Sequence, residues 1–598
     1  MIIFLQHPFD LKRLRTIKNP RIITFDHESH KILSQNHISH TQSEEFLTKD
    51  DYNSIEITCH EWAQWFHQES FNKIFTIDGI NLGSLFEWEF HFYLVPIIKK
   101  IFEIKKISAR FDKSECICSS FLESIAEKFF KSTELFDEVK IDNPQLFDNV
   151  KWNLTNDLEI SIKKENFEKM KNFSEKILLN FSKLNERKDN KDKSILFVEF
   201  DPTRFENLCS KMADSKIKPI FFNHRRPYFW DRRSFKIINK TEGEIITYKD
   251  NSDEDNDKNI IKKKIESIED CYFKKYFSLN DKSFWEIIKD DFLKMIYKKM
   301  KDGIKLIRMG KDLFNDRNIQ EIIIWSENGF SEQVIIELGK KRKIPINLIQ
   351  HGIIVDEDNK KNHEFNRFSG ILPIKSDRYL AWNRSTQDYI ISSGFAPENI
   401  IQIGNTNFDL ISNDKKYEET GYVLLATTAP IKNQHAGYNS KLLDNYEYEL
   451  SVMCKKIKEQ NRKLIVRPHP FSQEFKVDNI VKDSFPDAII DKKTDITTLI
   501  KKSEVLVSYG ISTIIFEAQI LEKPVFFIRS EHDMFGIPKY LKKIPESMMK
   551  FDEIGDYISK IYEKKEYKNS IIRTNSTIMS DEFFNLGQST ENFLRFYE

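Results

Sequence analysis

Residues 321–352 read EIIIWSENGFSEQVIIELGKKRKIPINLIQHG and contain the pattern that decides the fold. Apolar runs at 321–325 and 346–350 flank a stretch near 331–341 whose apolar residues recur at helical spacing. A strand, a helix and a second strand in this order form a βαβ unit, in which the two strands are parallel. We therefore expect a parallel sheet covered by helices, with ligands binding beyond the carboxyl ends of its strands.

The same alternation extends in both directions from this unit. Upstream, the apolar runs Ser194–Phe200 and Pro219–Phe222 predict another βαβ unit. The polar stretch 412–419 separates two such arrays and is expected to be a hinge. The fold class is therefore α/β with two doubly wound, Rossmann-like domains. Downstream strands are expected at 378–382, 400–403, 422–426, 463–466, 504–508 and 524–528, with helices near 385–393, 441–460, 495–502 and 512–521.

The first 190 residues mix helix and strand signals and are expected to form an α/β extension. Strands are expected at 21–25 and 73–77, followed by a helix that begins at Ser84, its N-cap, and runs to about Ile104. The charged stretch 186–193 is expected to be a linker. A second charged cluster, at 250–264, is expected to be an acidic loop.

Composition excludes several classes of protein. The 598 residues include 93 Lys plus Arg and 93 Asp plus Glu, so the formal net charge is zero and provides no global attraction to nucleic acid. Six cysteines in so long a chain do not form a disulfide scaffold, which favours a reduced, cytoplasmic protein. The sequence shows no signal peptide and no run of 18 apolar residues, so we expect any membrane contact to be peripheral, at the inner face.

Two histidines follow predicted strands. His351, in Gln350-His351-Gly352, is expected to project from a strand end, and imidazole is the side chain best suited to accept a proton near neutral pH. His469 lies in Arg467-Pro468-His469-Pro470, where two prolines stiffen the loop. Arg467 and His469 are thereby held in place, and this pair of side chains suits phosphate oxygens.

A loop rich in hydroxyl groups follows another predicted strand. Ser508 is followed by Ser512 and Thr513, either of which is a natural N-cap for the next helix, and free backbone amides at a helix N-terminus attract anions. Glu517 lies one turn beyond Thr513 on the same helix face and is expected to reach ribose hydroxyls. Two acidic residues are given structural roles: Asp409 is expected to cap a helix or fix the hinge, and Asp356 to be a surface acid.

Several nucleotide and hydrolase templates are absent from the sequence. It contains no GxxxxGK[ST] motif of P-loop NTPases, no GxSxG elbow and no HExxH helix. A GxGxxG turn that opens a helix is also missing, which argues against a dinucleotide-dependent oxidoreductase.

Four motifs together resemble a known superfamily: Glu-Asn-Gly at 327–329, Gln-His-Gly at 350–352, Arg-Pro-His-Pro at 467–470 and the segment from Ser508 to Glu517. The arrangement resembles GT-B glycosyltransferases of the surface-polysaccharide kind. It is similar to CDP-glycerol glycerophosphotransferases and to Kdo and polysialic-acid transferases with His-Pro and Ser/Thr motifs, and more distantly to UDP-N-acetylglucosamine 2-epimerases.

The resemblance implies an enzyme that moves a sugar, or a polyol phosphate, from a CMP-, CDP- or UDP-activated donor to a cell-surface glycan or a lipid-linked acceptor. It implies no metal and no cofactor, because helix dipoles and basic side chains stabilise the leaving phosphate in this fold. His351 is then the candidate base or charge stabiliser, with Glu327 as a second catalytic candidate. The residues implied to bind the donor are Arg467, His469, Ser508, Ser512, Thr513 and Glu517.

The same resemblance assigns roles to the expected domains. Residues 1–190 are an extension of unknown role, 191–412 an acceptor domain and 420–575 a nucleotide-donor domain. Residues 576–598 would form a C-terminal helix that packs back on the acceptor domain.

Two other functions stay open. A nucleotide-sugar 2-epimerase would use the same donor cleft but needs paired carboxylates near the sugar, for which only Glu327 and Glu332 are candidates. A non-catalytic glycan-assembly protein could keep the fold without the chemistry. Failure to bind any nucleotide would exclude both enzymes.

Overall fold

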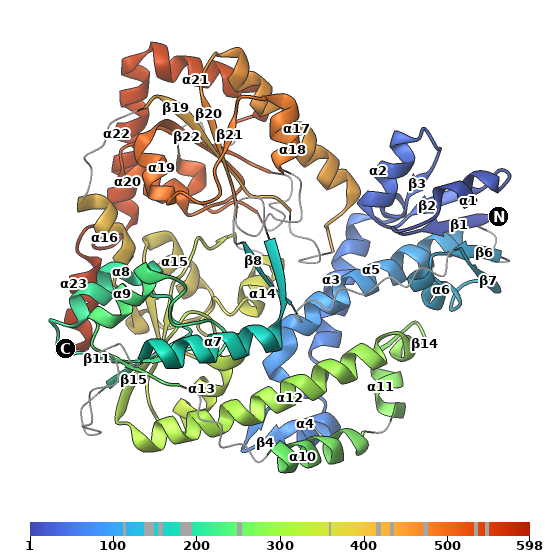
Figure 1. Cartoon of the computed structure of the whole chain (residues 1–598), viewed down its shortest axis with the longest axis horizontal. Helices are drawn as coiled ribbons and strands as arrows, with labels where there is room; N and C mark the ends of the chain where they lie inside the picture. The colour runs from blue at the N-terminus through green and yellow to red at the C-terminus, as the bar shows by residue number, and fades with distance from the viewer. Residues whose placement is uncertain are drawn as a thin grey trace. The chain divides into compact units, whose positions relative to one another are not determined.

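The computed structural model describes most of the chain, and Figure 1 shows its helices and strands. The chain forms two compact units. Unit 1 comprises Met1–Asn149, Ser252–Ile304 and Pro430–Asn445, and unit 2 comprises Val150–Asn251, Lys305–Ala429 and Tyr446–Glu598. Of the residues described, no helix is both long enough and apolar enough to cross a bilayer. The residues described are 1–111, 115–136, 149–153, 159–179, 194–247, 254–268, 270–357, 360–413, 420–430, 436–469, 477–530, 536–544 and 549–598.

Unit 1 contains a parallel sheet of its own, here called the N-terminal sheet, with strand order β3-β2-β1-β6-β7. Strand β1 is buried along its whole length, and its Ile3 and Leu5 belong to one core with Leu14 and Leu33 from the helices that follow β1 and β2. The elements are β1 (Ile2–Leu5), α1 (Leu11–Thr16), β2 (Arg21–Thr24), α2 (His27–Gln35), β3 (Thr41–Gln42), β6 (Glu115–Cys118), α6 (Ser120–Ala126) and β7 (Ser132–Leu135).

An aromatic core joins distant parts of the sequence within unit 1. The ring centroid of Trp65 lies 6.1 Å from that of Phe273 and 5.1 Å from that of Phe292. Residues 252–304 therefore pack with residues 1–149 and not with the first Rossmann-like domain, to which the sequence pattern assigned them. The helices concerned are α3 (Lys49–Ala63), α4 (Glu69–Phe75), α5 (Glu87–Arg110), α10 (Glu254–Glu266), α11 (Asp270–Tyr276) and α12 (Trp285–Asp316).

Three local predictions for this part of the chain are wrong. The strand expected at 73–77 is mostly the end of α4, and only Thr76–Ile77 form a strand, β4, which pairs with β5 (Ile80–Asn81). Ser84 does not cap α5, because its hydroxyl donates to the carbonyl of Asn81. Within the acidic loop expected at 250–264, the described residues 254–264 belong to helix α10, in which Ile261 is buried, so apolar spacing outweighs the local charge.

Unit 2 contains two parallel sheets that follow one another along the chain. The first, here called the central sheet, has strand order β12-β11-β10-β15-β16-β17-β18 and is parallel throughout. Its strands are β10 (Ser194–Val198), β11 (Lys218–Phe222), β12 (Glu244–Ile245), β15 (Ile319–Ile324), β16 (Ile346–Ile349), β17 (Arg378–Ala381) and β18 (Ile400–Gln402). Its helices are α8 (Glu206–Met212), α9 (Arg232–Lys240), α13 (Phe330–Lys341), α14 (Lys360–Phe368), α15 (Arg384–Ser392) and α16 (Thr406–Asn413).

The second, here called the C-terminal sheet, has strand order β21-β20-β19-β22-β23 and is also parallel. Its strands are β19 (Tyr422–Thr427), β20 (Leu464–Pro468), β21 (Ile489–Ile490), β22 (Ser503–Tyr509) and β23 (Val525–Ile528), and its helices are α17 (Ser440–Glu459), α18 (Val477–Ser484), α19 (Ile496–Lys502) and α20 (Ile514–Ile520). The predicted α/β architecture with two doubly wound, Rossmann-like domains is therefore confirmed.

All three sheets share one topological feature. In each of them the first strand along the chain lies between the second and the fourth, so the winding reverses beside that strand. An open α/β sheet binds ligands at such a reversal, outside the carboxyl ends of its strands. In unit 2 this directs attention to the segments after β10 and β15 and after β19 and β22.

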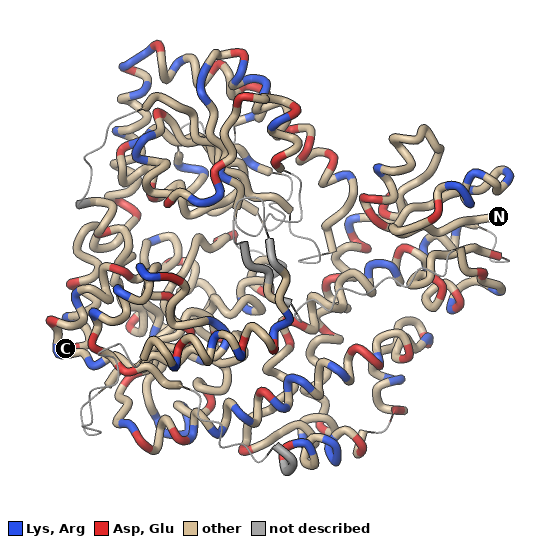
Figure 2. The backbone as a smooth tube through the Cα atoms, viewed as in Figure 1, with Lys and Arg blue, Asp and Glu red and all other residues tan. Residues whose placement is uncertain are grey.

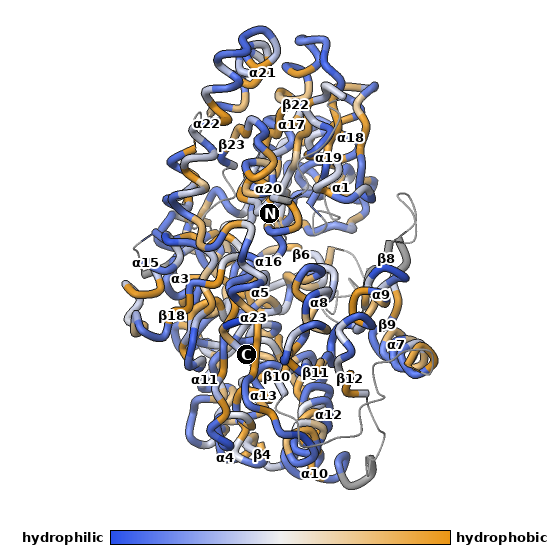
Figure 3. The backbone as a smooth tube through the Cα atoms, turned by 90° about the vertical axis from the view of Figure 1, so that its left-hand side faces the viewer, coloured by the Kyte–Doolittle hydropathy of each residue, from blue (hydrophilic) through white to orange (hydrophobic). Residues whose placement is uncertain are grey.

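The last helix packs on the central sheet. Phe593 of α23 (Ser589–Tyr597) is buried in one core with Ile195 and Phe197 of β10. The preceding helices, α21 (Ile554–Glu563) and α22 (Lys565–Glu582), alternate hydrophobic and hydrophilic residues along their length, as Figure 3 shows. Asp409 holds α23 in place, because its carboxylate accepts the backbone N–H groups of Ser589 at 3.0 Å and Thr590 at 2.7 Å. This is the structural role expected for Asp409.

Charges of both signs are interspersed along the described elements of each unit (Figure 2). This agrees with the zero formal net charge. Basic groups that matter for ligand binding must therefore be sought as local clusters at the strand ends.

Candidate functional site

A buried glutamate organises the carboxyl edge of the central sheet. Glu199 follows β10 with φ +53° and is 1% exposed. Its carboxylate accepts the backbone N–H groups of His224 and Arg225, each at 2.9 Å, and the hydroxyl of Ser331 at 2.7 Å. Burial alone would raise the pKa of Glu199, but the Arg225 charge and these hydrogen bonds lower it to about 2. An ionised Glu199 thus fixes the loop after β11.

Two arginines from this edge lie against one tryptophan. The guanidinium carbon of Arg204, in the short helix Pro202–Phe205, lies 5.7 Å from the ring centroid of Trp325. That of Arg226 lies 5.5 Å from the same ring. Arg204, Arg226 and Trp325 come from the segments after β10, β11 and β15. Two guanidinium groups held over one indole form a local positive patch able to bind phosphate oxygens.

Charges of this positive patch contribute to a lowered pKa of both predicted histidines, His351 and His469. Burial and the charges of Arg204 and Arg226 lower the pKa of His351 to about 4. Burial and the charge of Arg204 also lower the pKa of His469. Since His351 follows β16 of the central sheet and His469 follows β20 of the C-terminal sheet, Arg204 links the two sheet edges of unit 2 electrostatically. Both imidazoles are neutral at pH 7 in this state.

The Arg-Pro-His segment is held by its neighbours in the C-terminal sheet. The backbone N–H of His469 donates to the carbonyl of Thr427 at 2.9 Å, which places His469 beside the end of β19. Arg467 turns toward the end of β21, where its Nη1 donates to the Asp491 carbonyl at 3.0 Å and lies 3.7 Å from the Asp491 carboxylate. Pro470 lies outside the described residues.

The hydroxyl-rich segment after β22 has a defined structure. The Ser508 hydroxyl is buried and donates to the carbonyl of Gly510, whose φ of +92° produces the turn. Thr513 is the N-cap of α20 but makes no side-chain capping hydrogen bond, and Ser512 precedes it, half-buried. Burial raises the pKa of Glu517 to about 7, while a hydrogen bond from the Thr497 hydroxyl at 3.0 Å acts in the opposite direction.

Glu327 is engaged by backbone groups. It is 2% exposed, and its two carboxylate oxygens accept N–H groups of Ile374, Lys375 and Ser376 at 2.7–3.0 Å. Burial raises its pKa, although these hydrogen bonds favour the ionised form. The observed contacts of Glu327 therefore position the 374–376 segment.

Asp356 is not a surface acid, contrary to expectation. It is 3% exposed, and its carboxylate accepts the backbone N–H of Lys539 at 2.7 Å. The neighbouring Glu357 accepts the N–H of Ile537 at 3.3 Å and pairs with Lys542. The acidic segment after β16 thus anchors the described residues 536–539, and the sequence missed this because the partners are 180 or more positions away.

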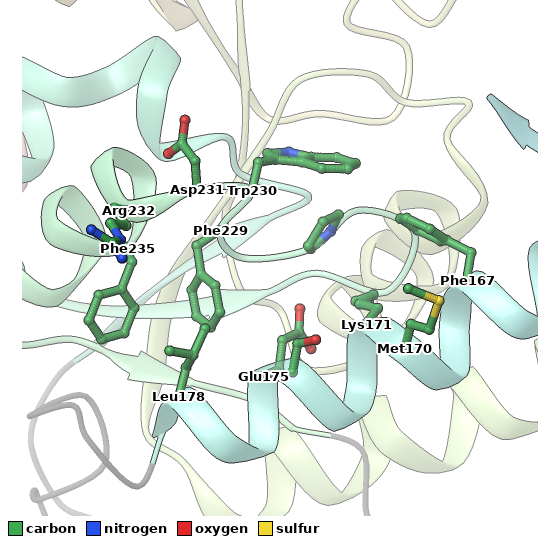
Figure 4. A pocket seen from close by; sticks show the side chains of 12 residues that line it. Phe167, Met170, Lys171, Glu175, Leu178, Phe229, Trp230, Asp231, Arg232 and Phe235 are labelled. Carbon is green, nitrogen blue, oxygen red and sulfur yellow. The ribbon is translucent and has the colours of Figure 1, made fainter. Parts of the chain in front are cut away.

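A pocket of about 370 Å³ lies beside the loop after β11 (Figure 4). Side chains of α7 (Lys164–Leu179) line one side, and Phe229, Trp230 and Phe235 line the other. The lining is mostly apolar, and Trp230 is 47% exposed. Lys171 of α7 donates to the His224 carbonyl at 2.7 Å. This hydrogen bond connects the helix that lines the pocket to the loop that carries Arg225 and Arg226.

Arg204, Trp325 and Glu199 were not singled out from the sequence. Each lies just beyond a strand that the sequence did predict, so the strand ends alone could have drawn attention to them. Their mutual contacts depend on neighbouring parallel strands, which a single strand pattern does not specify.

Comparisons with known proteins reveal similarity of fold only. No family model matches the chain, and no curated protein matches it by sequence. Among solved structures, a UDP-GlcNAc 2-epimerase from Neisseria meningitidis is similar, with a TM-score of 0.40 and 12% identity over 67% of this chain and 99% of that one. A glycosyltransferase from Rickettsia africae has a TM-score of 0.37 and 12% identity over 68% and 98%.

The wall teichoic acid polymerase TagF has a TM-score of 0.36 and 13% identity over 72% of this chain and 96% of that one. At such low identities and TM-scores, these similarities do not identify a donor or an acceptor.

Proposed function

We propose that the protein is a GT-B glycosyltransferase that moves a sugar, or a polyol phosphate, from a nucleotide-activated donor to a cell-surface glycan or lipid-linked acceptor. The observation that carries this proposal is the cluster of Arg204, Arg226, His351 and His469, which draws on the carboxyl edges of both sheets of unit 2. Doubly wound sheets bind ligands at such an edge, and the positive charge of the cluster complements the negative charge of a nucleotide diphosphate.

In this proposal the donor phosphates bind at the positive patch. Arg204 and Arg226 neutralise the charge that develops on the leaving phosphate, and His469 contacts the same group from the C-terminal sheet. Ser508, Ser512, Thr513 and Glu517 remain proposed donor contacts, with Glu517 toward the ribose. Arg467 contributes to the donor site from the strand end, where its hydrogen bond to the Asp491 carbonyl holds it.

Since arginine side chains neutralise the leaving phosphate in this proposal, transfer needs no divalent cation. We expect the same rate without added Mg²⁺ or Mn²⁺.

His351 is proposed to take the proton of the acceptor hydroxyl. Burial, together with the charges of Arg204 and Arg226, lowers its pKa to about 4 and makes it a weak base. An anionic donor at Arg204 and Arg226 would offset their charge and raise the pKa of His351 toward the range in which imidazole is an effective base. Donor binding would thereby make His351 a stronger base. Glu327 is proposed as a positioning residue.

The acceptor is proposed to bind on the central-sheet side, at the pocket lined by α7 and Trp230. An apolar pocket with exposed aromatic rings suits the hydrocarbon part of a lipid-linked acceptor, and membrane contact would then be peripheral. The proposed location of the protein is cytoplasmic, at the inner face of the membrane.

The experiment that tests the proposal is a thermal-shift screen of the full chain against CMP, CDP, UDP and GDP. A nucleotide at 100 times its dissociation constant stabilises the folded state by about 2.7 kcal/mol, which is readily measured. We expect at least one nucleotide to raise the melting temperature, and His469→Ala to abolish that shift. No shift with any nucleotide would contradict both the transferase and the epimerase.

The epimerase alternative requires two free carboxylates near the sugar. Glu327 is held by three backbone N–H groups, and both carboxylate oxygens of Glu332 accept from Nη2 of Arg225, at 2.6 and 2.9 Å. Both carboxylates are therefore engaged, which favours the transferase. A non-catalytic role would be supported by nucleotide binding without turnover of any donor.

A further inference from the structure

We propose that Glu56, His60 and His91 form a binding site for a transition-metal dication, with Zn²⁺ as the best-suited ion. All three residues belong to unit 1, whereas the proposed donor site lies in unit 2. The metal site therefore goes beyond the proposed transfer reaction and does not depend on it.

Two helices bring the three side chains together. Glu56 and His60 are four residues apart on α3 and thus lie on the same helix face, while His91 comes from the second turn of α5. One ligand atom from each residue lies within 4.8 Å of the other two. Nε2 of His91 is 4.0 Å from a carboxylate oxygen of Glu56, and the ring centroids of His60 and His91 are 4.5 Å apart.

These separations are close to those that a bound ion needs. Bonds of about 2.0–2.2 Å in a tetrahedral site place neighbouring ligand atoms about 3.3 Å apart. In the proposed site, side-chain rotations of the two histidines and the glutamate would close the remaining difference from the observed separations of up to 4.8 Å.

The largely buried position of Glu56, His60 and His91 favours a bound cation, which would offset the cost of burying these polar side chains. His91 is 2% exposed, and the Glu56 side chain is 15% exposed, so the three groups sit where desolvation is costly. The other carboxylate oxygen of Glu56 accepts the backbone N–H of Ala436 at 2.6 Å. A hydrogen bond of this kind orients a ligating carboxylate, as outer partners do in established metal sites.

The ligand chemistry selects the metal. Two imidazole nitrogens and one carboxylate oxygen suit Zn²⁺, whereas Mg²⁺ and Ca²⁺ prefer sets of oxygen ligands. Three protein ligands leave a fourth position for water. Because Glu56 also holds Ala436, the ion would tie α3 and α5 to the described residues 436–445, and we expect it to stabilise unit 1.

The test uses the full chain, stripped of metal with a chelator and titrated with Co²⁺, whose visible absorption reports tetrahedral coordination. We expect one equivalent of Co²⁺ to bind, Zn²⁺ to displace it, and Zn²⁺ to raise the melting temperature of the wild type. Glu56→Gln keeps the size of the side chain and an oxygen that can accept from Ala436. It should weaken Zn²⁺ binding at least tenfold, and His60→Ala at least 100-fold.

The matched control is His37→Asn. His37 is an exposed histidine of the same unit with φ +55°, a conformation that asparagine tolerates, and Zn²⁺ binding should be unchanged in this variant. His30→Ala tests the other histidine cluster of unit 1, in which His30 lies 3.2 Å from Asp444. Absence of Co²⁺ binding by the wild type would overturn the proposal, as would loss of binding in His30→Ala with full binding in Glu56→Gln.

Discussion

Arg204 is the side chain whose charge acts on both histidines of the proposed donor site. It lies over Trp325, and its positive charge contributes to the lowered pKa of His351 and of His469. Arg204→Gln should therefore raise the pKa of both imidazoles, measured by NMR titration of the histidine rings. The variant should also bind nucleotide about 10- to 150-fold more weakly, because a charge-assisted hydrogen bond contributes about 1.5–3 kcal/mol.

Arg573→Gln is the control for this substitution, because Arg573 is exposed on α22. Histidine pKa values that stay unchanged in Arg204→Gln would show that Arg204 does not act on His351 and His469.

His351 is proposed to act in transfer and not in donor binding. His351→Ala should keep the nucleotide-induced thermal shift of the wild type and lower the transfer rate by about 10²- to 10⁴-fold, the usual contribution of a general base. The measurement is the rate of donor consumption at saturating donor and acceptor. Loss of nucleotide binding in this variant would assign His351 to the donor site instead.

Glu517 should make folding stability depend on pH. Burial raises its pKa to about 7, from about 4.5 in an unfolded chain, so the folded state binds more protons between these values. Its stabilising contribution is present below pH 4.5 and is lost as pH rises through 7. The unfolding free energy of the wild type, relative to Glu517→Gln, should fall by up to about 3 kcal/mol over this range in urea titrations. A constant difference would show that Glu517 is solvated.

Helix α23 depends on a cap that lies 180 positions earlier in the chain. Asp409 accepts the N–H groups of Ser589 and Thr590, and Gly404, with φ +86°, leaves no room for a side chain against Ser589. Asp409→Ala should lower the unfolding free energy by about 2 kcal/mol, because two backbone donors at a buried helix start lose their acceptor.

Asp409→Asn should cost less than Asp409→Ala, since the amide oxygen still accepts one hydrogen bond. Asp483→Ala, at an exposed position of α18, is the control and should be neutral. Equal stability of Asp409→Ala and the wild type would mean that α23 is held by its apolar face alone.

At the level of elements, the predicted strands of unit 2 agree closely with the structure. Strands predicted at 422–426, 463–466 and 504–508 are found at 422–427, 464–468 and 503–509. These segments are buried on both faces, so an unbroken apolar run identifies them. The predicted strand at 73–77 was wrong because its apolar residues face the aromatic core of a helical region, and apolar content alone does not separate the two cases.

For the whole molecule, unit 1 is assembled from three separate stretches of sequence. Phe71 stacks on Phe273 at 4.4 Å, and Trp62 lies edge-on to Phe277 at 5.4 Å. A chain restricted to residues 194–598 would leave the aromatic rings of 252–304 without these partners. We expect it to aggregate or to bind a hydrophobic dye, whereas the full chain remains soluble in the same buffer.

Size-exclusion chromatography and dye fluorescence check this expectation. A soluble 194–598 chain that unfolds cooperatively and binds nucleotide as the full chain does would contradict it, and would show that residues 252–304 fold without residues 1–149.

The sequence by itself determined the class of fold and the points along the chain where ligand-binding groups would follow strands. Apolar runs and helical spacing are local, and parallel strands must end at a common edge, so His351, His469 and the loop after Ser508 could be found without coordinates. Tertiary structure decided which of these groups interact, and it added Arg204, Trp325 and the Glu56, His60 and His91 cluster. It also showed that the carboxylates of Glu327 and Asp356 bind backbone N–H groups. The physical reason is that electrostatic and hydrogen-bonded contacts depend on distances in space, and the packing of distant segments sets those distances.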